Sequence, residues 1–158
     1  KWDVRDPALA RRMAATYGEA RDSQVRVFPD ALEAIGLFRS KGVRLALITN
    51  GSAETQRAKI RRFNLAGLFD HILIEGEVGV GKPEAGIYQL ALGKLGVSAD
   101  EAWMIGDNFE WEIAAPQRLG IKGVWLDHRG AGVPADATVQ PYLVIRSWSE
   151  LMSRVRTD

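Results

Sequence analysis

Short apolar runs alternate with amphipathic stretches along most of this chain, and this alternation constrains the fold more than any other feature. Apolar runs occur at 43–49, 71–75, 103–105, 123–126 and 142–145, and helical patterns separate them. Strands that alternate with helices in this way form parallel sheets covered by helices. The sequence therefore predicts an α/β fold with a mostly parallel sheet.

Capping residues indicate where several of the helices begin. Asp30 and Ser52 are each placed to cap a helix that starts at the next residue. Pro83 is expected to open a third helix, because proline is favoured in the first helical turn. Ser147 and Glu150 have the spacing of a capping box, which predicts a C-terminal helix after them.

Two helical stretches have unusual features. The helix expected at 109–119 contains Pro116, which cannot donate a hydrogen bond to the carbonyl of Glu112, so the sequence predicts a kink there. The stretch 7–20 is also helical in pattern, but no strand precedes it in the chain. It is typical of a helix that belongs to a larger unit.

Composition excludes several classes of function. The 158 residues suit one domain, and a net charge of +1 without blocks of like charge argues against nucleic acid as the main partner. The absence of cysteine excludes disulfides and thiolate sites. No apolar run is long enough to span a bilayer and no signal peptide is present, so we expect a cytoplasmic protein that does not act at a membrane. The chain begins with Lys1, not Met, so we do not expect it to begin at a natural translation start.

Thr49, Asn50 and Gly51 lie where a buried strand ends and a helix begins. A hydroxyl and free backbone N–H groups at a helix N-terminus suit a phosphate group, because the orphan donors and the helix dipole both favour an anion. The same residues also fit an ordinary Asn-Gly turn. The stretch alone leaves both interpretations open.

Lys82 follows a glycine-rich segment between a strand and a helix, close to the P-loop pattern of nucleotide triphosphatases. The next position of a P-loop needs a hydroxyl for Mg²⁺, and here it is Pro83, which also removes a backbone donor. This argues against a P-loop. Lys82 is either a solvent-exposed loop residue or a point charge that offsets a phosphoryl group or a carboxylate.

Asp107 lies at the exit of the strand at 103–105, and Glu112 lies in the first turns of the next helix. Carboxylates at these positions suit Mg²⁺, which prefers a few hard oxygen ligands and keeps several waters. Acids near a helix N-terminus are also favoured by the helix dipole alone. We assign Glu110 to that second explanation, and His71 and His128 show no ligand spacing.

The order and spacing of these stretches are more specific than any one of them. The segments 48–51, 79–83 and 105–108, with Glu112, closely resemble the haloacid dehalogenase (HAD)-like hydrolases, and in particular their phosphatase branch with a helical cap. The resemblance covers about residues 25–146 and implies a Rossmann-like three-layer α/β/α core. It implies that 1–24 are a remnant of the helical cap and that 25–158 form an incomplete core domain.

The resemblance also implies a role for each matching residue. Thr49 would hydrogen-bond the phosphoryl group, helped by the backbone of Asn50 and Gly51, and Lys82 would stabilise the nucleophile and the bound phosphate. Asp107, counted among the catalytic residues with Thr49 and Lys82, and Glu112 would hold Mg²⁺. The family more often has Asp at the position of Glu112, whose longer side chain would bind the metal through water.

The segment that supplies the nucleophile in this family, Asp-x-Asp-x-Thr, does not occur in these 158 residues. Its strand lies in the middle of the family's sheet, between the strand that ends at Thr49 and the strand that precedes Asp107. Without it, two strands would expose unpaired backbone across a central slot, and such edges recruit other chains. We expect the slot to be closed by a complementing N-terminal fragment, by a strand exchanged between the protomers of a homodimer, or by a rearranged sheet order.

Two functional hypotheses follow. In the first, the chain is part of a Mg²⁺-dependent phosphatase that acts on small phosphate esters through an aspartyl-phosphate, and is inactive or weak alone. In the second, it is a truncated, non-catalytic relative that works by dimerisation or by binding a partner.

Overall fold

The computed structural model describes residues 6–10, 12–13 and 25–156. Residues 7–10 and 12–13 are helical, and the Asp6 Oδ1 accepts a hydrogen bond of 2.8 Å from the amide of Ala8 at the start of this turn. The remainder of the helix predicted at 7–20 lies outside the described residues. The assignment of 1–24 to a cap therefore stays a prediction. No helix in the described ranges has the length and apolar character needed to cross a membrane.

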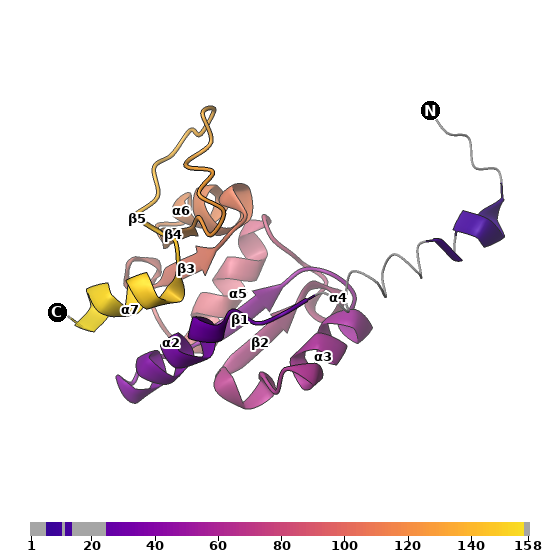
Figure 1. Cartoon of the computed structure of the whole chain (residues 1–158), viewed down its shortest axis with the longest axis horizontal. Helices are drawn as coiled ribbons and strands as arrows, with labels where there is room; N and C mark the ends of the chain where they lie inside the picture. The colour runs from indigo at the N-terminus through magenta and orange to yellow at the C-terminus, as the bar shows by residue number, and fades with distance from the viewer. Residues whose placement is uncertain (1–5, 11, 14–24, 157–158) are drawn as a thin grey trace.

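The described chain forms parallel strands in two separate sheets, as Figure 1 shows. The first sheet pairs β1 with β2, and the second has the order β3-β4-β5. The strands are β1 (Ala46–Thr49), β2 (His71–Ile74), β3 (Trp103–Gly106), β4 (Lys122–Leu126) and β5 (Leu143–Ile145). The predicted α/β fold with parallel pairing is confirmed. The strand expected at 43–49 begins three residues later than predicted, at Ala46.

Helices cover both faces of the strands. The α-helices are α2 (Pro29–Ser40), α3 (Ala53–Arg62), α4 (Glu75–Val78), α5 (Ala85–Leu95), α6 (Ala115–Gln117) and α7 (Trp148–Arg156). The 3₁₀ turns are η1 (Ala66–Leu68) and η2 (Ala99–Glu101), and η3 (Glu110–Ala114) is π-helical.

Two apolar clusters define the layers. Met104 packs in the cluster that contains Ile87 and Tyr88 of α5, whereas the next residue, Ile105, packs in the cluster that contains Leu151 of α7. Successive strand residues point to opposite faces, so α5 and α7 lie on opposite sides of the second sheet. Helix α2 packs beside α7, which makes three layers (Figure 1).

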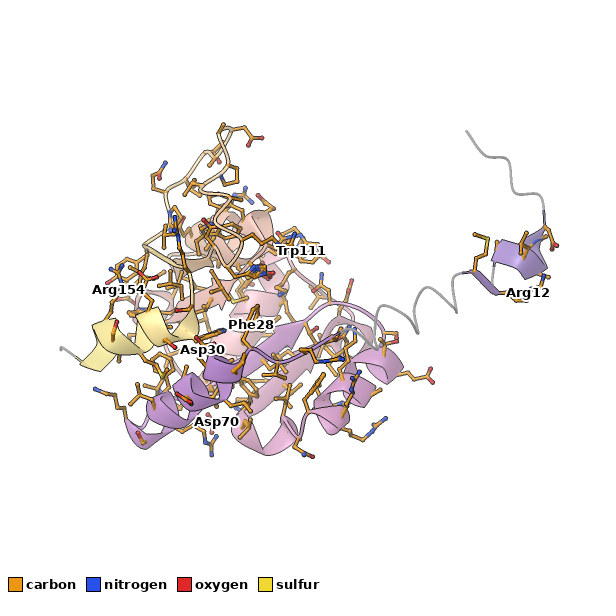
Figure 2. All side chains as sticks on the ribbon, in the orientation of Figure 1. Arg12, Phe28, Asp30, Asp70, Trp111 and Arg154 are labelled. Atoms are coloured by element: carbon orange, nitrogen blue, oxygen red, sulfur yellow. The ribbon has the colours of Figure 1, made fainter. Side chains whose placement is uncertain are left out.

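The predicted caps differ in their outcome. The Ser52 side chain accepts from the amide of Thr55 at 3.3 Å, which confirms it as the cap of α3. The prediction for Asp30 was wrong, because α2 already begins at Pro29 and places Asp30 inside the first turn. Its carboxylate instead accepts from the amide and hydroxyl of Ser149, at 2.9 and 3.0 Å, and so joins α2 to the start of α7 (Figure 2).

The C-terminal capping box is present in modified form. The Ser147 hydroxyl accepts from the amide of Glu150 at 3.1 Å, as predicted. The Glu150 carboxylate reaches the amide of Arg146 at 2.8 Å, one residue before the position expected for a reciprocal box. Both contacts satisfy donors that the helix itself cannot pair.

The helix predicted at 109–119 is instead a π-helical turn, η3, followed by the short helix α6. The amide of Ala115 donates to the carbonyl of Glu110, five residues back, which is the spacing of a π turn. Pro116 follows directly and has no N–H to continue the α-helical pattern. In place of the kink predicted at Pro116, the helix changes type, from the π-helical turn η3 before the proline to the α-helix α6 that contains it.

A groove separates the two sheets, with β1 on one side and β3 on the other. Its volume is about 670 Å³, and the residues that line it are mostly apolar and come from both sheets and both helical layers, including Phe38, Leu45, Leu47, Ile48, Leu92, Trp103, Met104, Ile105 and Trp148. Within the described ranges no strand lies between β1 and β3. For the described residues, the sheet therefore lacks its central strand, as predicted, and the predicted alternative of a rearranged sheet order is wrong. The two other ways of closing the slot stay predictions.

The packing of β4 on η3 gives a test of the fold. A Cβ atom added to Gly123 would lie 3.0 Å from the Cα of Ile113, a backbone atom that cannot rotate away. Gly123→Ala should therefore lower the free energy of unfolding by about 1–3 kcal/mol, measured by urea denaturation.

Gly36 is the matched control, because it lies inside α2 and a Cβ there meets no atom within 4 Å. Gly36→Ala should raise the free energy of unfolding by about 0.5–1 kcal/mol. Equal effects of the two substitutions would contradict the packing described for η3.

Candidate active site

The predicted site segments meet at the carboxyl ends of the strands. The register places Thr49 opposite Ile74, so the turns after β1 and β2 are neighbours. The side chain of Asn50 forms two hydrogen bonds with the backbone of Lys82: its Nδ2 donates to the carbonyl at 2.6 Å, and its Oδ1 accepts from the amide at 2.9 Å. Asn50 therefore fixes the position of the Lys82 backbone, a role that the sequence did not predict.

Thr49 and Gly51 are already engaged in this arrangement. The Thr49 hydroxyl donates to Oε1 of Gln56 on α3 at 3.1 Å. The amide of Gly51 donates to Oε2 of Glu75 at 2.9 Å. Gly51 has a φ of 116°, a backbone conformation that favours glycine. The binding roles of Thr49, Asn50 and Gly51 stay predictions, and the Gly51 amide is not free for a ligand here.

Lys82 is not a solvent-exposed loop residue. Its Nζ lies 2.5 Å from Oε1 of Glu112, and only 10% and 6% of the two side chains are exposed. The second oxygen of Glu112 accepts from the amide of Asn108 at 2.7 Å. Burial of two charges is tolerated only when they are paired and hydrogen-bonded, and this pair meets both conditions.

Gly106 makes this ion pair sterically feasible. A Cβ atom added there would lie 2.7 Å from Cδ of Glu112 and closer still to its Cγ. The Glu112 side chain can fold back over the end of β3 only because residue 106 has no side chain. The packing of Glu112 therefore explains why the residue before Asp107 is a glycine.

Two aromatic residues lie near the pair. The ring of Trp111 lies 6.0 Å from Lys82 Nζ, at the outer limit of a cation–π contact. Tyr88 of α5 donates from its hydroxyl to the carbonyl of Trp111 at 2.6 Å. Burial, together with the negative charge of Glu112, raises the pKa of Tyr88 well above its ordinary value of 10.0.

Asp107 lies apart from the buried pair. Its side chain is 60% exposed, and its Oδ2 lies 3.6 Å from Nε2 of His128. In the described ranges no three Asp, Glu, His or Cys side chains come together as a metal site. Of the two predicted metal ligands, Asp107 has an exposed carboxylate, while both oxygens of Glu112 are engaged. Mg²⁺ accepts one or two carboxylates with substrate phosphate and water, so Asp107 fits such an ion in part. The metal roles of Asp107 and Glu112 stay predictions.

The sequence did not predict that three further residues lie at the site. Gln56 and Glu75 hold the turn after β1, and His128 faces Asp107. A signal was available for Glu75 and His128, because each follows a strand end closely and the carboxyl ends of parallel strands gather at one edge. Gln56 had no such signal, since it lies one turn inside a helix.

The buried pair can be tested by its stability. Lys82→Met should lower the free energy of unfolding by about 3–5 kcal/mol, because it leaves the Glu112 carboxylate buried without its counter-ion. Lys82→Met combined with Glu112→Gln should recover at least half of this loss in the same urea titration. Arg118→Ala removes the exposed pair with Glu110, where 59% and 49% of the side chains are exposed, and should cost less than about 1 kcal/mol. A double variant no more stable than Lys82→Met would contradict this account.

The buried hydroxyl of Tyr88 predicts a pH dependence. Because its pKa is raised in the folded chain, the folded state keeps a proton that the unfolded state loses as the pH rises above about 10. Stability should therefore fall as the pH rises above 10, and it should fall less steeply for Tyr88→Phe. Urea titrations of both proteins between pH 8 and 11 measure this difference. Parallel curves would show that Tyr88 does not contribute.

Comparisons with known proteins agree with this geometry. A family model described as haloacid dehalogenase-like hydrolase matches residues 5–120. The chain is 35% identical over 145 residues to a phosphoserine phosphatase of Thermus thermophilus, covering 92% of this chain and 57% of that protein. It is 33% identical over 112 residues to a glyceraldehyde 3-phosphate phosphatase of Pyrococcus abyssi, covering 71% and 47%.

The fold has solved counterparts as well. A HAD phosphatase from Thermococcus onnurineus superposes with a TM-score of 0.74 at 27% identity, over 82% of this chain and 58% of that one. The chain thus spans about half the length of the curated relatives it matches. The family model and the sequence identities together show that the chain belongs to the haloacid dehalogenase-like hydrolases.

Proposed function

We propose that this chain forms part of a phosphatase that acts on small phosphate esters through an aspartyl-phosphate. The observation that carries the proposal is the open groove between β1 and β3, which ends at the same edge as Thr49, Lys82 and Asp107. A strand that fills the groove parallel to its neighbours would deliver its last residues to this edge. The relatives named as phosphatases of small phosphorylated compounds support the reaction class.

The predicted site residues have the following parts in this proposal. The hydroxyl of Thr49 donates to a phosphoryl oxygen after exchanging its bond to Gln56, and the backbone of Asn50 assists it. Lys82 supplies positive charge to the carboxylate nucleophile and the phosphoryl group, while Glu112 holds its ammonium in place. Asp107 holds Mg²⁺, which when bound offsets the negative charge of the phosphoryl group.

The nucleophile comes from the strand that fills the groove. Its carboxylate attacks phosphorus, and the bond from phosphorus to the ester oxygen breaks. The departing oxygen takes a proton from the second acid of the Asp-x-Asp-x-Thr segment, as the family resemblance implies, and water then hydrolyses the acyl phosphate. This chain has no Asp-x-Asp, so we expect it to be inactive or weak alone.

Complementation tests the proposal. A synthetic peptide of apolar residues ending in Asp-x-Asp-x-Thr should enter the groove and produce hydrolysis of an aryl phosphate when MgCl₂ is present. Tryptophan fluorescence reports binding separately, because Trp103 and Trp148 line the groove. Asp107→Asn should lower the complemented rate at least about a hundredfold. The control Glu110→Gln removes an exposed acid three residues along and should leave the rate unchanged.

The controls separate the outcomes. A peptide with Asn in place of the first Asp should bind but give no turnover. Hydrolysis by the chain alone that disappears in Asp107→Asn would show that another residue is the nucleophile.

A non-catalytic module is the alternative function. The edges of β1 and β3, which no strand of the described part of the chain pairs with, favour it specifically, since such edges recruit strands of other chains. It predicts a stable dimer by light scattering and no turnover with any peptide. A monomer in solution would contradict the version with strand exchange.

A further inference from the structure

Glu75 links two turns of the site, although it belongs to none of the predicted motifs. It is the first residue after β2, and its Oε2 accepts from the amide of Gly51 in the turn after β1 at 2.9 Å. Its own carbonyl accepts from the amide of Gly79 at 2.8 Å. The residue thus contacts both the turn that carries Thr49 and the loop that leads to Lys82.

Glycines make room for this side chain. A Cβ atom added to Gly81 would lie 2.7 Å from Cδ and 2.8 Å from Cγ of Glu75. Gly81 is buried and directly precedes Lys82. The carboxylate of Glu75 therefore lies between Gly51 and Gly81, held by a hydrogen bond on one side and by close packing on the other. A further bond from the amide of Gly76 to the carbonyl of Gly51, at 3.0 Å, joins the same two turns.

This position has an electrostatic consequence. A carboxylate beside a phosphate-binding turn repels a phosphate dianion, and the cost is lowest when the carboxylate is held on a donor of its own. The Gly51 amide is that donor. With Gly51 engaged, the turn presents the Thr49 hydroxyl and the Asn50 backbone to a ligand.

We propose that Glu75 is a positioning residue: it holds the Thr49–Gly51 turn against the Gly81–Lys82 segment and so sets the spacing of the groups that bind the phosphoryl oxygens. The inference rests on the proposed function. It adds to the proposed site a residue that positions Gly51 and Gly81 and does not itself contact the substrate.

Glu77 provides a matched control on the same short helix. Its carboxylate forms an exposed bidentate pair with Arg57 of α3, at 2.6 and 2.7 Å. Removing its charge changes the net charge of α4 as much as removing that of Glu75. Among the contacts of the described residues, Glu77 is a partner of neither Gly51 nor Gly81.

The first test needs no activity. In a ¹⁵N NMR spectrum of the chain, Glu75→Ala should shift the Gly51 amide resonance and speed its hydrogen exchange about tenfold, since the amide loses a charged acceptor. Glu75→Gln keeps an acceptor oxygen and should retain most of the protection, and Glu77→Gln should leave the resonance in place. An unchanged Gly51 resonance in Glu75→Ala would overturn the proposal. So the proposal can fail here even if the peptide restores full activity.

The second test uses the chain complemented with the Asp-x-Asp-x-Thr peptide. Glu75→Ala should raise KM for the aryl phosphate about tenfold with kcat changed less than threefold, because the lost interaction positions groups that bind substrate and transition state alike. Glu75→Gln should stay within about threefold of the parent chain. A lower KM in both variants would show that Glu75 acts only by repulsion, and would overturn the positioning role.

Gly81→Ala keeps the proposal testable if Glu75→Ala fails to fold. The new methyl group should push aside the far end of the Glu75 side chain, which can rotate, and so reproduce the rise in KM. An unchanged KM in Gly81→Ala would contradict the positioning role. When Glu75→Ala does fold, adding Gly81→Ala to it should change KM by less than a further factor of about two, because the two changes disrupt one contact. Independent, multiplying effects would overturn the proposal. If no peptide restores turnover, the proposed function is wrong. The NMR experiment then still tests whether Glu75 holds the Gly51 amide.

Discussion

The ion pair between Lys82 and Glu112 joins the two sheets at the edge where the site lies. Lys82 follows β2 in the chain and Glu112 follows β3, so the pair connects elements on opposite sides of the groove. Tyr88 of α5 adds a second connection through its hydrogen bond to the carbonyl of Trp111. Because the strands themselves do not pair across the groove in the described chain, these side chains hold the site edge together.

The pair also explains why neighbouring residues have the identities they have. Gly106 is small because Glu112 folds back over it. The backbone N–H of residue 108, which any residue except proline would supply, donates to the second oxygen of the same carboxylate. Asn50, which follows the neighbouring strand β1, fixes the Lys82 backbone with two hydrogen bonds. A buried charge without any of these partners would be costly, so the geometry of the site and the stability of the fold depend on the same contacts.

The sequence predicted contacts between residues that are close to one another in the chain, such as helix caps. The Ser52 cap and the Ser147 hydroxyl contact involve residues three apart, and both are present. The prediction for Asp30 was wrong because the helix starts at Pro29, two residues earlier than predicted. The partner of Asp30, Ser149, lies 119 residues away in the sequence. The strand ends were identified and their order revealed the family, but the partner of Lys82 was not predicted. That pairing depends on how the turn before α5 and the π-helical turn η3 approach in space, which periodicity does not encode.

The groove and the incomplete chemistry have one physical cause in this proposal. A strand that pairs with β1 on one side and β3 on the other would gain two ladders of backbone hydrogen bonds. It would also pack against the apolar side chains from both helical layers that line the groove. The same strand would bring a carboxylate to Lys82, where positive charge is already held in place. The strand cannot pair in the groove without bringing its end to the site. The free energy gained when the strand binds would therefore also position the nucleophile. For this reason the stability of the assembled sheet and its activity should depend on the same segment.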